Sequence, residues 1–150
     1  MMLADRAEST VNAMKRELPF REVEHTADRA FLVRGVDLKE LFVRAAQALF
    51  SLEGANPELP PSISRHVEVT GVDHEVLLVN WLNELLYRQE AHGEAYVRFD
   101  IHALSQQKLR ATIYGVPNAS TRRVIKAVTF HGLKLERPAD RWEAVVVVDV

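Results

Sequence analysis

The spacing of apolar residues first predicts a helix over residues 37–52. Asp37 is a suitable N-cap for this helix, and Glu40, three residues later, completes a capping-box-like pair. Apolar side chains then recur three and four positions apart, so that one face of the helix is expected to be buried. These residues are Leu38, Leu41, Phe42, Ala45, Ala46, Leu49 and Phe50.

A second helix is predicted over residues 74–92. Asp73 stands at its N-cap position and Gly93 follows its last turn, where a left-handed residue commonly ends a helix. The apolar residues of this segment cover a wide surface, so we expect the helix to lie against a sheet with little of it exposed. They are Leu77, Leu78, Trp81, Leu82, Leu85 and Leu86.

Most of the remaining sequence is typical of β-strands separated by turn residues. Strands before, between and after two helices predict an α+β fold, a single domain in which a mostly antiparallel sheet packs with two main helices. We assign this domain to residues 20–150 and an N-terminal extension to residues 1–19. The predicted strands are about 20–25, 28–34, 65–71, 95–104, 107–115, 122–136 and 141–150.

Composition narrows the function classes. The 150 residues contain no cysteine, which excludes disulfides, thiol catalysis and cysteine-based zinc sites. No apolar run approaches the roughly 20 residues that span a bilayer, and the N-terminus lacks the apolar core of a signal peptide, so a cytoplasmic location with no membrane partner is expected. Basic residues outnumber acidic ones over residues 105–150. This excess permits a phosphate- or RNA-facing patch, but a solvated face is the interpretation we favour.

Three charged residues stand in surroundings suited to burial. Asp28 lies at a predicted strand boundary, Asp149 ends an apolar strand, and Lys126 lies inside an apolar run. Two carboxylates with nearby carbonyls would form a hard-oxygen site for Ca²⁺ or Mg²⁺, provided that the second and last strands bring them together. Three other interpretations stay open: Lys126 pairs with one of the carboxylates, Asp28 is a turn residue, and Asp149 is an exposed terminus.

Catalytic motifs give little support for an enzyme. His25 and His131 could join Asp28 and Asp149 as ligands of a zinc or iron site, but the sequence has no HxxxH or HExxH spacing to support this. The sequence has no Ser-His-Asp order and no glycine-rich phosphate loop. A small metal-dependent hydrolase using His25, Asp28 and Asp149 is a remaining alternative, against which the lack of a base–nucleophile pair counts.

Five blocks of the sequence together resemble the archease family. They are EHTADRAFLVRG, LKELFVRAAQALF, LLVNWLNELLY, IKAVTFHGLKLE and the ending WEAVVVVDV, in the order and spacing of the family over about residues 20–150. The resemblance implies a non-enzymatic protein cofactor of an RtcB-type RNA ligase in tRNA splicing or RNA repair. Such a cofactor promotes formation of the ligase–guanylate intermediate and multiple turnover, and its contact with RNA is indirect.

The resemblance also implies roles for particular residues. A divalent metal, calcium in the family, falls on Asp28, Asp149 and Val150. The lysine that activates the ligase falls on Lys126, and His25 and His131 would lie near the metal ligands. The alternative implied by the family is a chaperone or modulator of an RNA-modifying enzyme such as a tRNA methyltransferase.

The sequence departs from the family pattern at three places. Arg29 and Ala30 follow the HTAD motif where a small apolar residue and glycine are usual, and Asn80 replaces an aspartate. The loop 116–121 lacks the usual acidic residues. Metal coordination or ligase contact is expected to differ in detail if these positions contribute to it.

Overall fold

The computed structural model describes residues 20–24, 29–118 and 125–150, with side chains from residue 29 onward except that of His131. This part of the chain contains the helices α2 (Leu38–Leu52) and α3 (His74–His92). Its strands are β1 (Phe20–Glu24), β2 (Arg29–Gly35), β3 (Ile63–Thr70), β4 (Ala95–Leu104), β5 (Lys108–Val116), β6 (Ala127–Glu136) and β7 (Trp142–Asp149).

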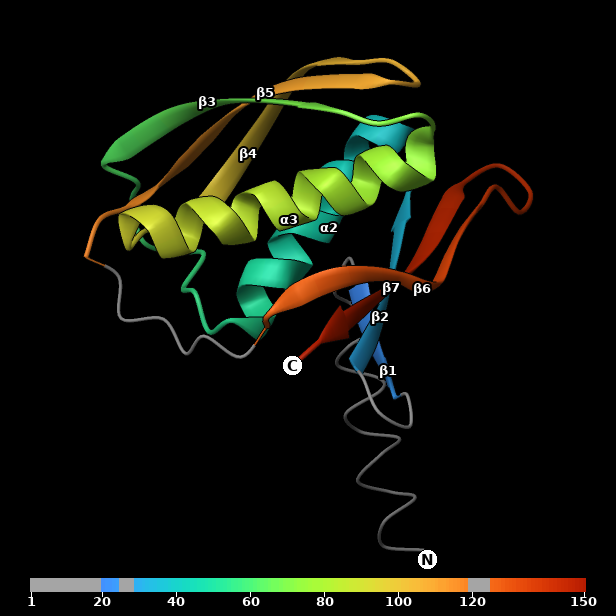
Figure 1. Cartoon of the computed structure of the whole chain (residues 1–150), viewed down its shortest axis with the longest axis horizontal. Coiled ribbons are helices and arrows are strands. Elements are labelled where there is room, and N and C mark those ends of the chain that lie inside the picture. The colour runs from blue at the N-terminus through green and yellow to red at the C-terminus, as the bar shows by residue number, and fades with distance from the viewer. Residues whose placement is uncertain (1–19, 25–28, 119–124) are drawn as a thin grey trace, which may run out of the picture.

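The strands form two antiparallel sheets with the helices between them (Figure 1). Sheet A has the strand order β1-β2-β7-β6, and sheet B has the order β3-β5-β4. The predicted α+β fold with antiparallel strands and two main helices is confirmed. The sequence predicts one sheet, whereas the strands divide into two. Periodicity along the chain does not specify which strands become neighbours.

Both helices begin and end at residues with local reasons to do so. At the start of α2, the Glu40 N–H donates to the Asp37 carboxylate at 2.8 Å, and the Val36 N–H donates to the Glu40 carboxylate at 3.1 Å. The predicted capping pair is therefore confirmed. Helix α3 begins with a 2.9 Å bond from the Val76 N–H to Asp73. It ends at Gly93, whose φ of 65° is left-handed.

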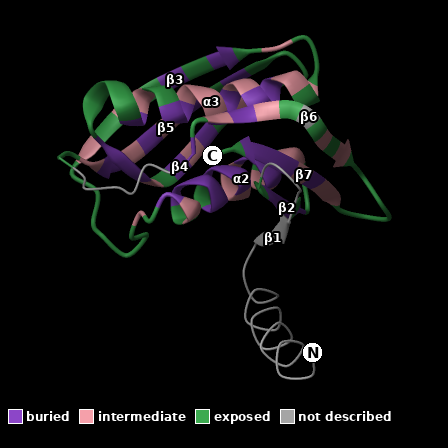
Figure 2. Ribbon diagram, turned by 60° about the horizontal axis from the view of Figure 1, so that its bottom comes forward, coloured by how far each residue is buried: buried purple, intermediate pink, exposed green. Residues whose placement is uncertain are grey.

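The core fills the space between the two sheets and surrounds both helices (Figure 2). Trp81 of α3 is fully buried, and its indole N–H donates to the Phe42 carbonyl of α2 at 3.0 Å. Phe50 packs edge-to-face on Tyr96, with ring centroids 5.5 Å apart. The six apolar residues named for α3 are all buried as expected, whereas Tyr87 keeps 64% of its surface exposed and the last three residues, 90–92, are exposed. Neither helix combines the length and the apolar character that crossing a bilayer requires, within the described residues.

The register of β2 and β7 defines two opposite ends of sheet A. Arg29 pairs with Val148 at one end, and Gly35 pairs with Trp142 at the other. The strand pairing needed to bring the ends near Asp28 and Asp149 together is thus present. Whether the two carboxylates meet lies beyond this finding, because Asp28 is outside the described residues.

Candidate functional site

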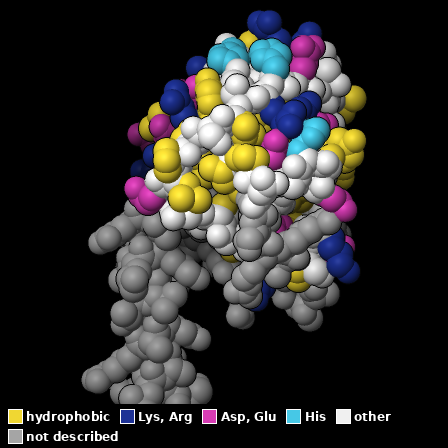
Figure 3. All heavy atoms as spheres, turned by 90° about the vertical axis from the view of Figure 1, so that its left-hand side faces the viewer, with side chains coloured by type: hydrophobic (Ala, Val, Ile, Leu, Met, Phe, Trp, Pro, Cys, Tyr) yellow, Lys and Arg dark blue, Asp and Glu magenta, His cyan; other side chains and the backbone are white. Residues whose placement is uncertain are grey.

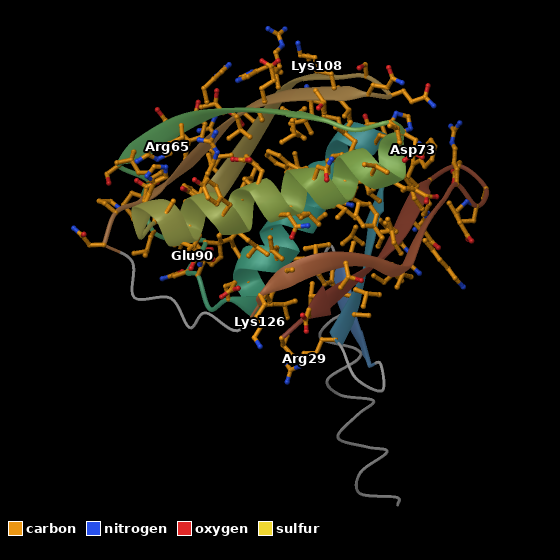
Figure 4. The ribbon with its side chains drawn as sticks, in the orientation of Figure 1. Arg29, Arg65, Asp73, Glu90, Lys108 and Lys126 are labelled. Carbon is orange, nitrogen blue, oxygen red and sulfur yellow. The ribbon has the colours of Figure 1, made fainter. Side chains whose placement is uncertain are left out.

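Lys126 and Asp149 are brought together by the main chain. The Lys126 N–H donates to the Asp149 carbonyl at 2.7 Å, immediately before Ala127 of β6 pairs with Asp149 of β7. Because β7 lies between β6 and β2, Arg29 at the start of β2 reaches the same end of the sheet. Figure 4 shows Arg29 and Lys126 near the C-terminal end of the chain. We call the group Arg29, Lys126, Asp149 and Val150 the lysine end.

The side chains of Lys126 and Asp149 face solvent. Both residues are exposed, and Val150 keeps 43% of its surface accessible. No ion pair joins Lys126 to Asp149, nor does either side chain bond to another described residue. The interpretation in which Lys126 neutralises Asp149 is therefore not what the structure shows. The backbones of the two residues are bonded to each other, and their side chains are exposed.

A buried carboxylate fixes the segment that precedes Lys126. Glu53, at the C-cap of α2, has no exposed surface, and its carboxylate accepts a 3.0 Å hydrogen bond from the Ile125 N–H. Burying a carboxylate is costly unless hydrogen bonds compensate it. An acidic residue at the C-terminal end of a helix also opposes the helix dipole. Glu53 is therefore explained by its bond to Ile125, which sets the position of the next residue, Lys126.

A second side chain fixes β6 from the other helix. Asn83 of α3 accepts from the Val128 N–H at 2.8 Å and donates to the Val128 carbonyl at 3.0 Å. Strand β6 is at the edge of sheet A, where outward backbone groups lack a strand partner. Asn83 supplies that partner. Glu53 and Asn83 thus clamp the start of β6 from two helices, and both were missed as site residues from sequence alone.

Only some of the remaining predicted site residues lie in the described part of the chain. His25 and Asp28 lie outside the described residues. His131 belongs to β6, in the stretch between Thr129 and Lys134 where the pairing register with β7 shifts. No cluster of three His, Asp or Glu side chains suited to a metal occurs among the described residues. Of the predicted calcium ligands, the described part of the chain contributes Asp149 and Val150, both at the lysine end.

Comparisons with known proteins agree with the resemblance. The model of the Archease protein family (MTH1598/TM1083) matches residues 20–150. The chain belongs to the archease family. Among curated relatives, protein archease of Methanopyrus kandleri is 36% identical over 140 residues, which cover 89% of this chain and 100% of the relative. Protein archease of Methanosarcina acetivorans is 36% identical over 139 residues, covering 87% of this chain and 95% of the relative.

Solved archease-like structures share the fold. The solution structure of Methanobacterium thermoautotrophicum protein 1598 is 29% identical, with a TM-score of 0.73, and the match covers 88% of this chain and 99% of that one. The crystal structure of an archease from Thermotoga maritima, described as a possible chaperone, is 26% identical with a TM-score of 0.63. That match covers 85% of this chain and 94% of the Thermotoga chain.

The departures from the archease pattern now have local explanations where the structure describes them. The Asn80 side-chain amide donates a hydrogen bond to the Thr70 carbonyl at 2.8 Å. An aspartate here could not donate this bond, because its carboxylate and the carbonyl are both acceptors. Ala30 is fully buried in β2, and Arg29 is exposed at its start. Of the departing loop, 116–118 are described and 119–121 are not.

Proposed function

We propose that this archease activates an RtcB-type RNA ligase without catalysing a reaction itself. In this role it promotes formation of the ligase–guanylate intermediate and multiple turnover during tRNA splicing or RNA repair. Membership of the archease family supports the proposal. The observation that carries it is the lysine end: Lys126 and Asp149 are joined through their backbones, while their side chains are exposed and bond to no other described residue.

The geometry suits an action on a partner protein. The Lys126 ammonium is a compact charge with three hydrogen-bond donors, and its backbone is fixed by Glu53, Asn83 and β7. A fixed base places this charge reproducibly when a partner docks. To activate the ligase, the archease must bind the guanylylation-competent state more tightly than the resting state. RNA need not touch this chain.

We propose that the lysine end binds a divalent metal as its cofactor. The archease resemblance implies that this metal is calcium. Asp28, Asp149 and Val150 would hold it through oxygen atoms, which are the donors that Ca²⁺ prefers. The described donors fit this chemistry, because the Asp149 carboxylate is exposed and engaged by no described residue. When bound, the metal supplies positive charge beside Lys126. Calorimetry with Ca²⁺ on wild type and Asp149→Asn tests the assignment, and equal binding by both proteins would remove Asp149 from the ligand set.

The decisive experiment measures ligase turnover. A sub-stoichiometric amount of the archease is mixed with the RtcB-type ligase of the same source, and RNA joining is followed beyond one turnover per ligase. We expect wild type and Lys134→Ala to raise turnover, and Lys126→Ala to fail. Lys134 is a matched control because it is an exposed lysine on β6, the strand that directly follows Lys126. No increase over ligase alone with the wild-type archease would refute the proposed function.

A chaperone for an RNA-modifying enzyme is the second candidate. It is supported by the description of the Thermotoga maritima relative as a possible chaperone. A chaperone of this kind requires a contiguous exposed apolar surface. On the face drawn in Figure 3, hydrophobic side chains are interspersed with polar and charged ones. Suppression of methyltransferase aggregation that is equal for wild type and Asp149→Asn, without any effect on ligase turnover, would favour this candidate.

A further inference from the structure

A pocket of about 230 Å³ lies at the opposite end of β2 and β7 from the lysine end. Its walls come from the end of β2, the turn into α2, the second turn of α2 and the connection between β6 and β7. The residues that line it are Arg34, Gly35, Val36, Arg44, Asp140 and Arg141. We call Arg34, Arg44 and Arg141 the arginine end.

Two of these arginines are positioned by carboxylates outside the pocket lining. The Arg34 Nε bonds to Glu143 at 2.7 Å. The Arg44 Nη1 bonds to Glu40 at 3.0 Å and donates to the Arg34 carbonyl at 3.1 Å. A guanidinium has five N–H donors, so these bonds leave further donors on both side chains. The Arg141 side chain is exposed and bonds to no other described residue.

The start of α2 adjoins the pocket, where the Val36 and Glu40 N–H groups already donate to the Glu40 and Asp37 carboxylates. Gly35 and Val36 line it directly before α2, which begins at Leu38. The N-terminal end of a helix carries partial positive charge and favours anions. The pocket is smaller than the roughly 300–1,000 Å³ of sites that enclose a drug-sized ligand. Its size therefore suits one anionic group rather than a whole nucleotide.

We propose that the arginine end binds a phosphate group carried by RNA or a nucleotide. The planar guanidinium matches phosphate oxygens in a bidentate manner, and three of them converge here from three segments of the chain. Three carboxylates oppose an anion here: Glu143 and Glu40 are paired with Arg34 and Arg44, and Asp140 lines the pocket itself. The proposal therefore predicts opposite effects for two adjacent residues: loss of Arg141 weakens binding and neutralisation of Asp140 strengthens it.

The test is an NMR titration of the full chain that follows the amide signals of Gly35 and Val36. The probes are inorganic phosphate, a short single-stranded RNA with a 5′-phosphate, and the same RNA with a 5′-hydroxyl. We expect saturable shifts at both amides with phosphate and with the 5′-phosphorylated RNA. Arg141→Gln should weaken the affinity by about tenfold, the loss of one charge-assisted hydrogen bond, and Asp140→Asn should tighten it.

The control is Arg110→Gln, which removes the same charge from an exposed position on β5 of the other sheet. It should leave the affinity unchanged. Equal binding of the two RNAs would identify a backbone phosphate as the ligand group, whereas preference for the 5′-phosphate would identify a chain end. Binding of inorganic phosphate alone would identify the free ion. Absence of shifts with all three probes, or equal weakening by Arg110→Gln and Arg141→Gln, would overturn the proposal.

Discussion

The two ends of the β2–β7 strand pair hold their charged residues in different ways. At the lysine end, Glu53 bonds to the backbone of Ile125, just before β6, and Asn83 bonds to the backbone of β6, while the side chains of Lys126 and Asp149 take no part in these bonds. At the arginine end the side chains of Arg34 and Arg44 are themselves bonded, to Glu143 and Glu40, while that of Arg141 bonds to no other described residue. At the lysine end, therefore, the side chains that hold the structure (Glu53 and Asn83) differ from the charged side chains that face solvent (Lys126 and Asp149).

This difference sets the expected energies. Removing a partner from a buried hydrogen-bonding group costs about 1–3 kcal/mol, because the group left behind is desolvated without compensation. An exposed ion pair contributes about 0–1 kcal/mol. Substitutions of the clamp at the lysine end should therefore change the free energy of unfolding most. Substitutions of the exposed charges at either end should change it least.

The largest effect is expected for Glu53→Ala. The Ile125 N–H loses its acceptor inside the protein, and we expect the free energy of unfolding to fall by about 2–3 kcal/mol. For a domain of this size the thermal midpoint should fall by roughly 5–10 °C. Glu53→Gln keeps a carbonyl oxygen that can accept the same bond, so its loss should be smaller. Urea and thermal denaturation measure both.

Glu58→Ala is the matched control for Glu53, since Glu58 is an exposed acidic residue in the loop after α2. Its thermal midpoint should stay at the wild-type value. A Glu53→Ala protein as stable as Glu58→Ala would show that the buried carboxylate does not hold β6. The contrast between the two ends of sheet A would then lose its basis.

Asn83→Asp should have the next largest effect. The carboxylate still accepts from the Val128 N–H, but it faces the Val128 carbonyl with an acceptor where the amide had a donor. We expect a loss of about 1–2 kcal/mol in the free energy of unfolding. Asn80→Asp makes the same change toward the Thr70 carbonyl at a more exposed bond, so it should cost less. Equal costs would show that Asn83 has no special role in fixing β6.

The ion pair between Arg65 of β3, which is partly exposed, and the buried Glu94, which precedes β4, gives a pH reference outside sheet A. Arg65 holds Glu94 by two hydrogen bonds of 2.6 and 2.8 Å, and Tyr96 donates a third of 2.8 Å. The Arg65 bonds, followed by that of Tyr96, lower the pKa of Glu94 below its ordinary 4.5, although burial opposes the shift. A carboxyl with a lowered folded-state pKa stabilises the protein above its unfolded pKa. That stability is lost as the pH falls toward the folded value.

We therefore expect the urea midpoint of wild type to fall as the pH is lowered from about 5 to 3, and Glu94→Gln to flatten this dependence. Glu68→Gln is the matched control. Its carboxyl also has a lowered pKa, through a hydrogen bond from Lys108, but both side chains are about half exposed. Flattening of equal size in the two variants would assign the acid sensitivity to surface charge in general.

The caps and strand positions were predictable because their causes are local. Asp37 and Asp73 each cap a helix by a bond to an N–H three residues later, and Gly93 ends α3 through its own left-handed backbone. The helices begin and end where these residues predicted. The positions of β4 and β7 likewise follow from their own residues. Lys126 and Asp149 could be singled out as candidates because charges in apolar runs are unusual.

The clamp could not be derived in the same way, because its bonds join distant positions. Glu53 and Ile125 are 72 residues apart, and Asn83 and Val128 are 45 apart. An acid at the C-terminal end of a helix was the one available signal for Glu53, and it does not name the partner. The arginine end is hidden for the same reason, since Arg34, Arg44 and Arg141 meet only through the strand pairing and the packing of α2.

The smallest effect on stability, and the sharpest test of the comparison, is expected for Lys126→Ala. The ammonium is exposed and bonds to no described residue, whereas the Lys126 N–H bond to Asp149 belongs to the backbone and survives the substitution. The thermal midpoint should therefore stay close to wild type, while ligase activation is lost. Lys126→Arg keeps the charge but changes the shape of the head group, so it should retain part of the activity if charge alone matters. A Lys126→Ala protein that unfolds would make this lysine structural, and one that folds and activates normally would remove it from the proposed function.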